Sequence, residues 1–266
     1  GWAATLSRTP AIVTRRVDSP ESPTAAAIRY APFRKVIAIS DNVAAVLRKS
    51  RVRNQKLATI RSAVAVDAMM PNVDRAILHR EFDIPVGAYA IAVVAQLIKR
   101  KGHRFLLDVL PGLLAEHPGI KVVFFGEGSS EAQLRALTSK LGLSGAVRFA
   151  GFRDDIDDYL AAFDLLVHPA EQEALGVAML KAAAAGLPVI AFDIPGSAEA
   201  VDHARTGILV APGDFSGLQR AIGVLIEEPD IGVDLGAAGR QRMQDDFSVE
   251  VMVESYLRLY EDLLHA

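Results

Sequence analysis

Three consecutive cations, Lys99, Arg100 and Lys101, stand in a loop that leads from an expected strand into an expected helix. A lysine offers a point charge to a phosphate, and the first turn of a helix offers unbonded N–H groups to the same anion. The loop therefore suits a phosphorylated ligand. A solvated helix start explains these cations equally well when the loop is considered alone.

A second loop carries Gly126 and Gly128 directly after an expected strand that ends at Phe125. Glycines at such a place allow a tight turn and a close approach of a ligand to the backbone. The dinucleotide fingerprint requires a third glycine at a set spacing and an acidic residue about 20 positions later. Neither is present, so a nicotinamide or flavin dinucleotide site is discounted.

The third segment is a polar loop that begins at His168 and leads into a helix of small residues. Gly176 in the first turn of that helix lets an anion reach the free N–H groups of residues 175–177. This geometry favours a diphosphate. His103 and His168 both lie near strand ends, where a lone histidine is more often structural than catalytic.

The elements that must position these loops follow one pattern. Short β-branched runs alternate with helical patterns, which predicts βα units on a parallel sheet. Several runs are apolar on both faces, as a sheet covered by helices on both sides requires. Ser40 is expected to cap a helix over 41–49, and Gly186 to end the helix that starts at Val177. Strands are predicted at 11–15, 35–39, 57–60, 90–95, 121–125, 147–150, 165–168, 188–191 and 208–210.

The composition excludes several classes of protein. With 51% hydrophobic and 23% charged residues, the 266-residue chain is neither disordered nor fibrous. It has no cysteine, which excludes a disulfide scaffold, a thiolate metal site and a cysteine nucleophile, and makes a reducing compartment the default. The longest apolar run, within 182–192, is too short to span a bilayer.

Charge is distributed unevenly along the chain. Residues 1–66 contain 12 Lys and Arg against 3 Asp and Glu, whereas the other 200 residues contain 17 against 29. The basic part is expected to face an anionic partner such as a lipid surface, a phosphorylated acceptor or nucleic acid. A solvated basic face is the alternative. No aromatic stacking platform accompanies the charges, so nucleic-acid binding is not expected.

The charge change coincides with a predicted domain boundary near 68–72. Residues 1–68 hold about three strands and one good helix, which resembles the distal part of an N-terminal domain whose beginning is missing. Residues 69–248 hold six strands and form a second, doubly wound domain. The last helix, 249–264 within the C-terminal part 249–266, carries an apolar stripe that is expected to pack back toward the N-terminal part. Its members are Val249, Met252, Val253, Tyr256, Leu259, Tyr260 and Leu263.

The motifs in this order resemble glycosyltransferase family 4, the retaining enzymes with the GT-B fold. The resemblance covers roughly residues 36–264 and rests on the K-G-H loop, the G-x-G loop and five further runs. These are VRFAGFRDDIDDYLAAFDLLVHP, EALGVAML, AAAAGLPVIA, PGSAEAV and TGILVAPGD. The run of residues 11–66 is similar to the end of the N-terminal domain in members that build bacterial lipopolysaccharide or exopolysaccharide. The resemblance implies an α/β fold with a nucleotide-sugar donor in the C-terminal domain and an acceptor in the N-terminal domain.

The resemblance also assigns roles to residues. Glu173 matches the first glutamate of the family's E-x7-E motif, which binds hydroxyls of the donor sugar. Lys101 matches the cation that neutralises the leaving diphosphate, so no metal or other cofactor is required. Gly176 with its neighbours Leu175 and Val177 matches the backbone that approaches the phosphates. The acid/base-side catalytic residues of the family would lie upstream of Gly1 and are not assigned.

Two positions depart from the family pattern at the nucleotide end of the donor. Lys181 replaces the second glutamate of the motif, and an ammonium has three donors but no acceptor for the ribose hydroxyls. Gln96 stands where the family often has an arginine beside the diphosphate. Lys181 is expected to reach a phosphate or another carboxylate, or to be a surface residue. Gly126, Gly128 and Glu199 complete the expected nucleotide-binding set.

The resemblance implies a retaining transferase that moves a sugar from a nucleotide-diphosphate sugar to a saccharide or lipid-linked acceptor in cell-surface glycan synthesis. The two departures predict a weakened or altered donor site, with loss of activity as one outcome. A GT-B nucleotide-sugar epimerase and a non-catalytic partner subunit with a decayed site are the alternatives. The expected location is cytoplasmic, with peripheral contact of the basic part at the inner face of an anionic membrane.

Overall fold

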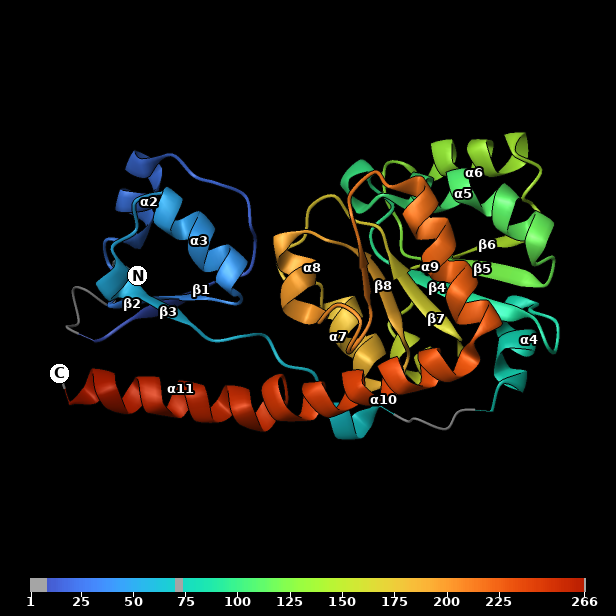
Figure 1. Ribbon diagram of the computed structural model, residues 1–266. Coiled ribbons are helices and arrows are strands. Elements are labelled where there is room, and N and C mark those ends of the chain that lie inside the picture. Colours follow the sequence, from blue (N-terminus) through green and yellow to red (C-terminus); the bar gives the residue numbers. More distant parts are fainter. Residues whose placement is uncertain (1–8, 70–73, 266) are drawn as a thin grey trace.

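The computed structural model describes residues 9–69 and 74–265, and within them lie two parallel β-sheets (Figure 1). The smaller sheet has the order β1-β2-β3, and Ile12 pairs with Lys35 across its first two strands. Two helices and a 3₁₀ turn connect these strands. The elements are β1 (Ile12–Arg15), α2 (Pro23–Tyr30), β2 (Lys35–Ala38), α3 (Asp41–Lys49), the 3₁₀ turn Asn54–Lys56 and β3 (Leu57–Thr59).

The larger sheet has the order β6-β5-β4-β7-β8-β9, and all of its pairs are parallel. Because the chain moves outward from β4 first to β5 and β6 and then to β7, β8 and β9, the strand order reverses between β4 and β7. Open α/β sheets bind ligands at such a reversal, outside the carboxyl ends of the strands. The strands are β4 (Tyr89–Val94), β5 (Ile120–Phe125), β6 (Val147–Gly151), β7 (Leu165–His168), β8 (Val189–Phe192) and β9 (Ile208–Val210).

Helices cover both faces of the larger sheet (Figure 1). Along β4 the side chains alternate between two apolar clusters: Ile91 and Val93 pack with the residues of α5 and α9, and Ala90 and Ala92 pack on the side of α7. Strands buried on both faces need continuous apolar runs, and β4 and β5 have them. The helices are α4 (Ala76–Phe82), α5 (His103–Glu116), α6 (Glu131–Lys140), α7 (Val177–Ala184), α8 (Pro195–Ala200), α9 (Phe215–Glu227), α10 (Pro229–Asp246) and α11 (Val249–Leu264). The 3₁₀ turns of this half are Val66–Ala68, Lys99–Lys101, Ile156–Asp158 and Leu160–Ala162.

The last helix lies along the smaller sheet, although it follows the larger one in the chain (Figure 1). Leu259 packs with Ile37 and Ile60 in a small apolar cluster. The hydroxyl of Tyr256 lies 3.3 Å from the hydroxyl of Thr14. The apolar stripe on α11 is narrower than predicted, because Val253 and Tyr260 are each 45% exposed.

All nine predicted strands are present within one or two residues of their expected ends, and the predicted α/β fold class is confirmed. The prediction of a single helix before residue 68 is wrong. Ser22 accepts a hydrogen bond from the amide of Ala25 and starts α2 with Pro23 in its first turn, which is a start signal visible in the sequence. The predicted domain limits stay a prediction, since part of the expected boundary, residues 70–73, lies outside the described residues together with Gly1 and Trp2.

Candidate functional site

Two loops meet at the strand-order reversal. One follows β4 and carries the 3₁₀ turn Lys99–Lys101, and the other follows β7 and leads into α7. The amide of Glu171 donates to the carbonyl of Arg100 over 2.9 Å, which joins the loops backbone to backbone. Gly102 has φ +70°, and a Cβ atom there would lie 1.8 Å from the carbonyl oxygen of Pro169. Only glycine permits this approach.

The joined loops bring Lys101, Glu173 and His168 together. The Nζ atom of Lys101 lies 2.5 Å from Oε2 of Glu173, and Nε2 of His168 lies 2.9 Å from the same oxygen. The amide of Ala174 donates to the other oxygen of Glu173 over 3.1 Å. Burial by itself would raise the pKa of the Glu173 carboxyl, but the hydrogen bonds and charges of His168 and Lys101 lower it to about 2. Glu173 is therefore ionised at neutral pH.

The predicted phosphate-facing backbone begins beside this cluster. Gly176 has φ +78° and starts α7 without a side-chain cap. Leu175 is buried, whereas Val177 is 36% exposed. The first amides of α7 therefore lie at an uncapped helix start three residues after Glu173, which is the arrangement expected for an anion.

A cavity of about 820 Å³ opens at the ends of β4, β5 and β6. Four predicted residues line it: Gln96, Gly126, Gly128 and Lys181. Glu173, Lys101 and the start of α7 are not among its lining residues, so the predicted site residues fall into two neighbouring groups. The cavity is lined by Val94, Ala95, Gln96, Phe125, Gly126, Glu127, Gly128, Phe152, Arg153, Asp154, Ile156 and Lys181.

Gly126 and Gly128 in the cavity wall are required by the close approach of two loops. Gly126 has φ +131°, and a Cβ atom there would lie 2.1 Å from the carbonyl oxygen of Ala95. A Cβ atom on Gly128 would lie 2.4 Å from the carbonyl oxygen of Leu97. The loop after β5 thus crosses the loop after β4 backbone against backbone, and only glycine permits this approach.

Lys181 forms an ion pair in the cavity wall. Its Nζ atom lies 2.7 Å from Oδ2 of Asp157, and each side chain is about one third exposed. Of the three expectations for this position, contact with another carboxylate is the one that the structure contains. Asp157 lies in the 3₁₀ turn Ile156–Asp158 and is not among the residues that line the cavity.

Glu199 is not among the residues that line the cavity, and its expected place in the nucleotide-binding set stays a prediction. Its two carboxylate oxygens accept hydrogen bonds from the backbone amides of Asp41 and Asn42, over 2.7 and 2.5 Å. These amides lie in the first turn of α3, so Glu199 from one half of the chain caps a helix of the other half. This contact between distant segments left no signal in the local sequence.

Several neighbours of the site were missed. Phe152 is 69% exposed at the cavity, and Arg153 beside it forms two hydrogen bonds of 2.7 Å with Asp155. Both residues stand in the motif that carried the family resemblance, which was the available signal. Asn42 donates its side-chain amide to the carbonyl of Glu173 over 2.9 Å. No sequence pattern points to that contact.

His103 is almost wholly buried at the start of α5. Its ring packs against Phe124 in an edge-to-face arrangement, with 82° between the ring planes and 5.2 Å between the ring centroids. Burial, with the nearby His168 and Lys101, lowers the pKa of His103 to about 4. The ring is therefore neutral at pH 7. His168, by contrast, contacts the site directly through Glu173.

Two parallel α/β halves with a cavity at the strand-order reversal of the second half define the architecture, and solved structures share it. The chain matches HepE of Anabaena, solved in complex with UDP, with a TM-score of 0.88 over all of this chain and 75% of that chain at 22% identity. The fold is therefore that of the GT-B glycosyltransferases.

Sequence comparison defines the family. Residues 74–242 match the family described as glycosyl transferases group 1, and the chain belongs to it. It is 32% identical to the lipopolysaccharide core biosynthesis glycosyltransferase LpsE of Rhizobium meliloti over 70% of this chain and 53% of that protein. It is 33% identical to the D-inositol 3-phosphate glycosyltransferase of Corynebacterium jeikeium over 74% of this chain and 50% of that protein. The chain thus spans about half the length of these relatives.

No helix in residues 9–69 and 74–265 is long and apolar enough to cross a membrane. The same residues contain no group of three or more His, Cys, Asp and Glu side chains that could hold a metal ion.

Proposed function

We propose that the protein transfers a sugar from a nucleotide-diphosphate sugar to a saccharide or lipid-linked acceptor in the synthesis of a cell-surface glycan, with retention at the anomeric carbon. The observation that carries the proposal is the buried Lys101 and Glu173 pair at the start of α7, next to a cavity large enough for a nucleotide. Membership of the group 1 family and the similarity to LpsE support it.

Lys101 is the proposed clamp for the diphosphate. Its ammonium has three N–H donors, and Glu173 takes one of them in the free protein. The others are available to phosphate oxygens, and the amides at the start of α7 add further donors. As the glycosidic bond breaks, negative charge accumulates on the departing nucleotide diphosphate, and this fixed cation stabilises it without a metal ion.

Glu173 is the proposed partner of the donor sugar. A carboxylate has roughly four acceptor sites. Lys101 and His168 contact Oε2, and the amide of Ala174 contacts Oε1. One acceptor site on Oε1 therefore remains for a hydroxyl of the sugar. Because the three neighbours hold the carboxylate in place, little conformational entropy is lost when the sugar binds.

The nucleotide end of the donor is proposed to be recognised in an altered way. Lys181 lines the cavity and cannot accept hydrogen bonds from ribose hydroxyls, and the carboxylate paired with its ammonium belongs to Asp157, which is not a lining residue. Phe152 offers an exposed aromatic face on which a base can stack. Gln96 lines the same cavity without adding charge.

Calorimetric titration of the chain with UDP-, GDP- and ADP-sugars tests the donor assignment. We expect one nucleotide class to bind and Lys101→Ala to weaken it at least about ten-fold, as loss of a charged hydrogen bond implies. Lys140→Ala, which removes a similar charge at the far end of α6, is the matched control and should leave binding unchanged. Absence of heat with all three sugars would refute the proposal.

The reaction itself is tested with the nucleotide sugar that binds and a glycan acceptor. Proton NMR of the product reports the anomeric configuration, and an inverted linkage would contradict retention. Conversion of the donor without any acceptor would indicate an epimerase instead.

A further inference from the structure

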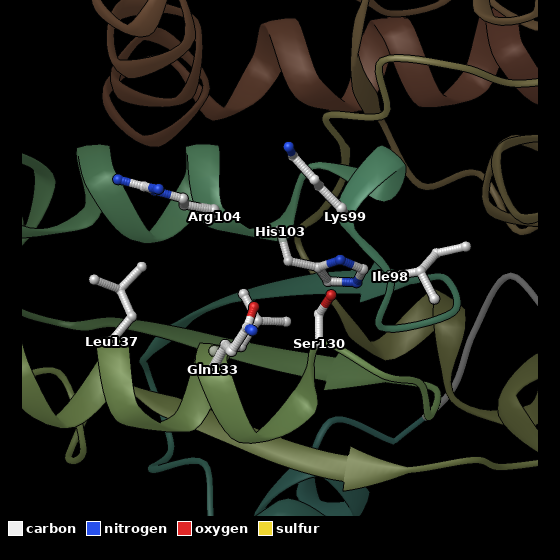
Figure 2. Close-up of a pocket in the computed structure, with 8 residues that line it drawn as sticks. Ile98, Lys99, His103, Arg104, Ser130, Gln133 and Leu137 are labelled. Carbon is white, nitrogen blue, oxygen red and sulfur yellow. The ribbon is translucent and has the colours of Figure 1, made fainter.

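A second cavity, of about 340 Å³, lies between the first turns of α5 and α6 (Figure 2). None of its lining residues lines the larger cavity at Lys181. The 3₁₀ turn Lys99–Lys101 separates the two places: Lys101 is directed to Glu173, while Lys99 lines the second cavity. The residues proposed above for the donor leave this cavity unexplained.

His103 is the buried polar group of this cavity. Its residue is 2% exposed, and neither ring nitrogen has a hydrogen-bond partner among the residues that the structure describes. Figure 2 shows the ring directed from the start of α5 toward Ser130 at the start of α6. Buried polar side chains are normally hydrogen-bonded, so an imidazole with two unused nitrogens in the wall of a cavity indicates a polar ligand.

Both helices present uncapped starts to the cavity. α5 begins at His103 and α6 begins at Glu131, and neither has a side-chain cap on its first amides. Unbonded N–H groups at helix starts attract anions. The amide of Glu131 already donates to the carbonyl of Gly128 over 3.1 Å, so the amides that α6 offers are the next ones of its first turn. The carboxylate of Glu131, which would oppose an anion, pairs with Arg135 at 2.8 Å and is not among the residues that line the cavity.

Two cations stand at the mouth of the cavity. Lys99 and Arg104 are both exposed lining residues, from the turn before α5 and from its first turn. Arg104 lies 3.3 Å from Asp108 on the same helix, and such an exposed pair is too weak to hold the guanidinium away from an anion. Two positive charges with two helix starts match the charge of a phosphate monoester better than that of a single carboxylate.

The size and the remaining walls specify what accompanies the phosphate. The cavity has more than ten times the ~30 Å³ that one water occupies in the liquid, so it exceeds the volume of inorganic phosphate. Gln133 and Ser130 offer hydrogen bonds to hydroxyl groups, and Ile98, Leu134 and Leu137 form an aliphatic wall. Apart from His103, none of the eight described lining residues is aromatic, which disfavours a nucleobase.

We propose that this cavity binds a phosphate monoester of a small polyhydroxylated molecule, of the size of a monosaccharide phosphate, at a site distinct from the nucleotide-sugar donor. In the complex Lys99, Arg104 and the first amides of α5 and α6 contact the phosphate. His103 hydrogen-bonds the ligand through one ring nitrogen. Gln133 and Ser130 contact the hydroxyl groups of the polyhydroxylated part of the ligand.

Titration with glucose 6-phosphate, mannose 6-phosphate and glycerol 3-phosphate tests the site. Inorganic phosphate and glucose are the controls, because each represents one half of a sugar phosphate. Nitrogen-15 NMR of the histidine rings reports binding, and loss of one signal in His103→Asn assigns the relevant ring. We expect at least one monoester to shift the His103 ring signals at saturation. It should bind at least about ten-fold more tightly than inorganic phosphate or glucose, since each half makes only part of the contacts.

Variants of exposed residues test the site without disturbing the fold or the binding of the nucleotide sugar. Lys99→Ala and Arg104→Ala should each weaken the monoester about ten-fold, as loss of a charged hydrogen bond implies, and Lys140→Ala should not. None of the three should change the affinity for the nucleotide sugar, so a failure of this site and a failure of the donor proposal are told apart. The proposal is overturned if no monoester moves the His103 signals at 10 mM, on the order of the weakest specific binding. It is equally overturned if inorganic phosphate binds as tightly, or if both surface variants bind like the unaltered chain.

Discussion

Lys101 and Glu173 are 72 positions apart in the chain, yet their charged atoms lie 2.5 Å from each other in a site where both side chains are almost buried. Each follows a strand that flanks the reversal of the strand order, and backbone contacts between the two loops hold them together. The pair is a structural feature of the free protein as well as the proposed contact for the donor. Changes at either residue should therefore be visible in both stability and binding.

Replacing Lys101 by alanine should lower the free energy of unfolding by about 1–3 kcal/mol, because Glu173 stays buried with His168 as its remaining side-chain partner. Urea denaturation measures this change. Lys140→Ala at the end of α6 is the matched control and should stay within about 0.5 kcal/mol of the unaltered chain. Equal stability of the two variants would show that the buried pair contributes nothing.

Acid should destabilise the fold through Glu173 in a defined window. The pKa of its carboxyl falls from 4.5 to about 2 on folding, so its contribution to stability is complete above pH 4.5 and is lost as the pH falls toward 2. The shift corresponds to about 3 kcal/mol. In Glu173→Gln this loss between pH 4.5 and 2 should be absent from denaturation curves, whereas the exposed Glu171→Gln should retain it.

His103 should produce a separate acid effect at higher pH. Its folded pKa of about 4 lies below the ordinary value of 6.5, so between these values the unfolded chain binds a proton that the folded chain refuses. Stability should then decrease as the pH falls from 6.5 to 4, by about 3 kcal/mol at most. His103→Gln should reduce this slope, and the exposed His79→Gln should not. Identical slopes in the two variants would contradict the assignment.

The ion pair of Lys181 and Asp157 can be tested by charge reversal. Lys181→Glu places two carboxylates at the former ion-pair distance, and since both side chains are one third exposed the cost should be about 1 kcal/mol, or about 2–4 °C in Tm. Adding Asp157→Lys should restore the Tm. We also expect the single variant to bind the nucleotide sugar more weakly, because it repels the phosphates. Tighter binding would instead indicate a decayed site that regains its glutamate.

Glu199 should protect the first amides of α3 although it belongs to the other half of the chain. Glu199→Ala removes both acceptors, and the loss of a helix cap costs about 0.5–2 kcal/mol. Hydrogen exchange of the amides of Asp41 and Asn42 should accelerate correspondingly. Ser248→Ala removes the cap of α11 and should leave these two amides unchanged, since it acts on a different helix.

Local sequence patterns determined most of the scaffold. Apolar runs at strand length, Ser40 before α3 and Gly186 after α7 act through contacts a few residues apart, so they were visible in the sequence. The same patterns placed the candidate loops after the correct strands. The second helix of the N-terminal part was missed although Ser22 and Pro23 mark its start, which was an error of interpretation and not a lack of signal.

Only the tertiary structure decided how those loops meet. It joined Glu173 to Lys101 and His168, and it paired Lys181 with Asp157 in a cavity wall. It directed Glu199 to α3 and left His103 unpartnered between two helix starts. Each of these relationships depends on strand order and on backbone approach between segments distant in the chain. A hydrogen-bonding residue carries no local mark of the partner it will meet, because that partner is chosen by the packing of the whole sheet.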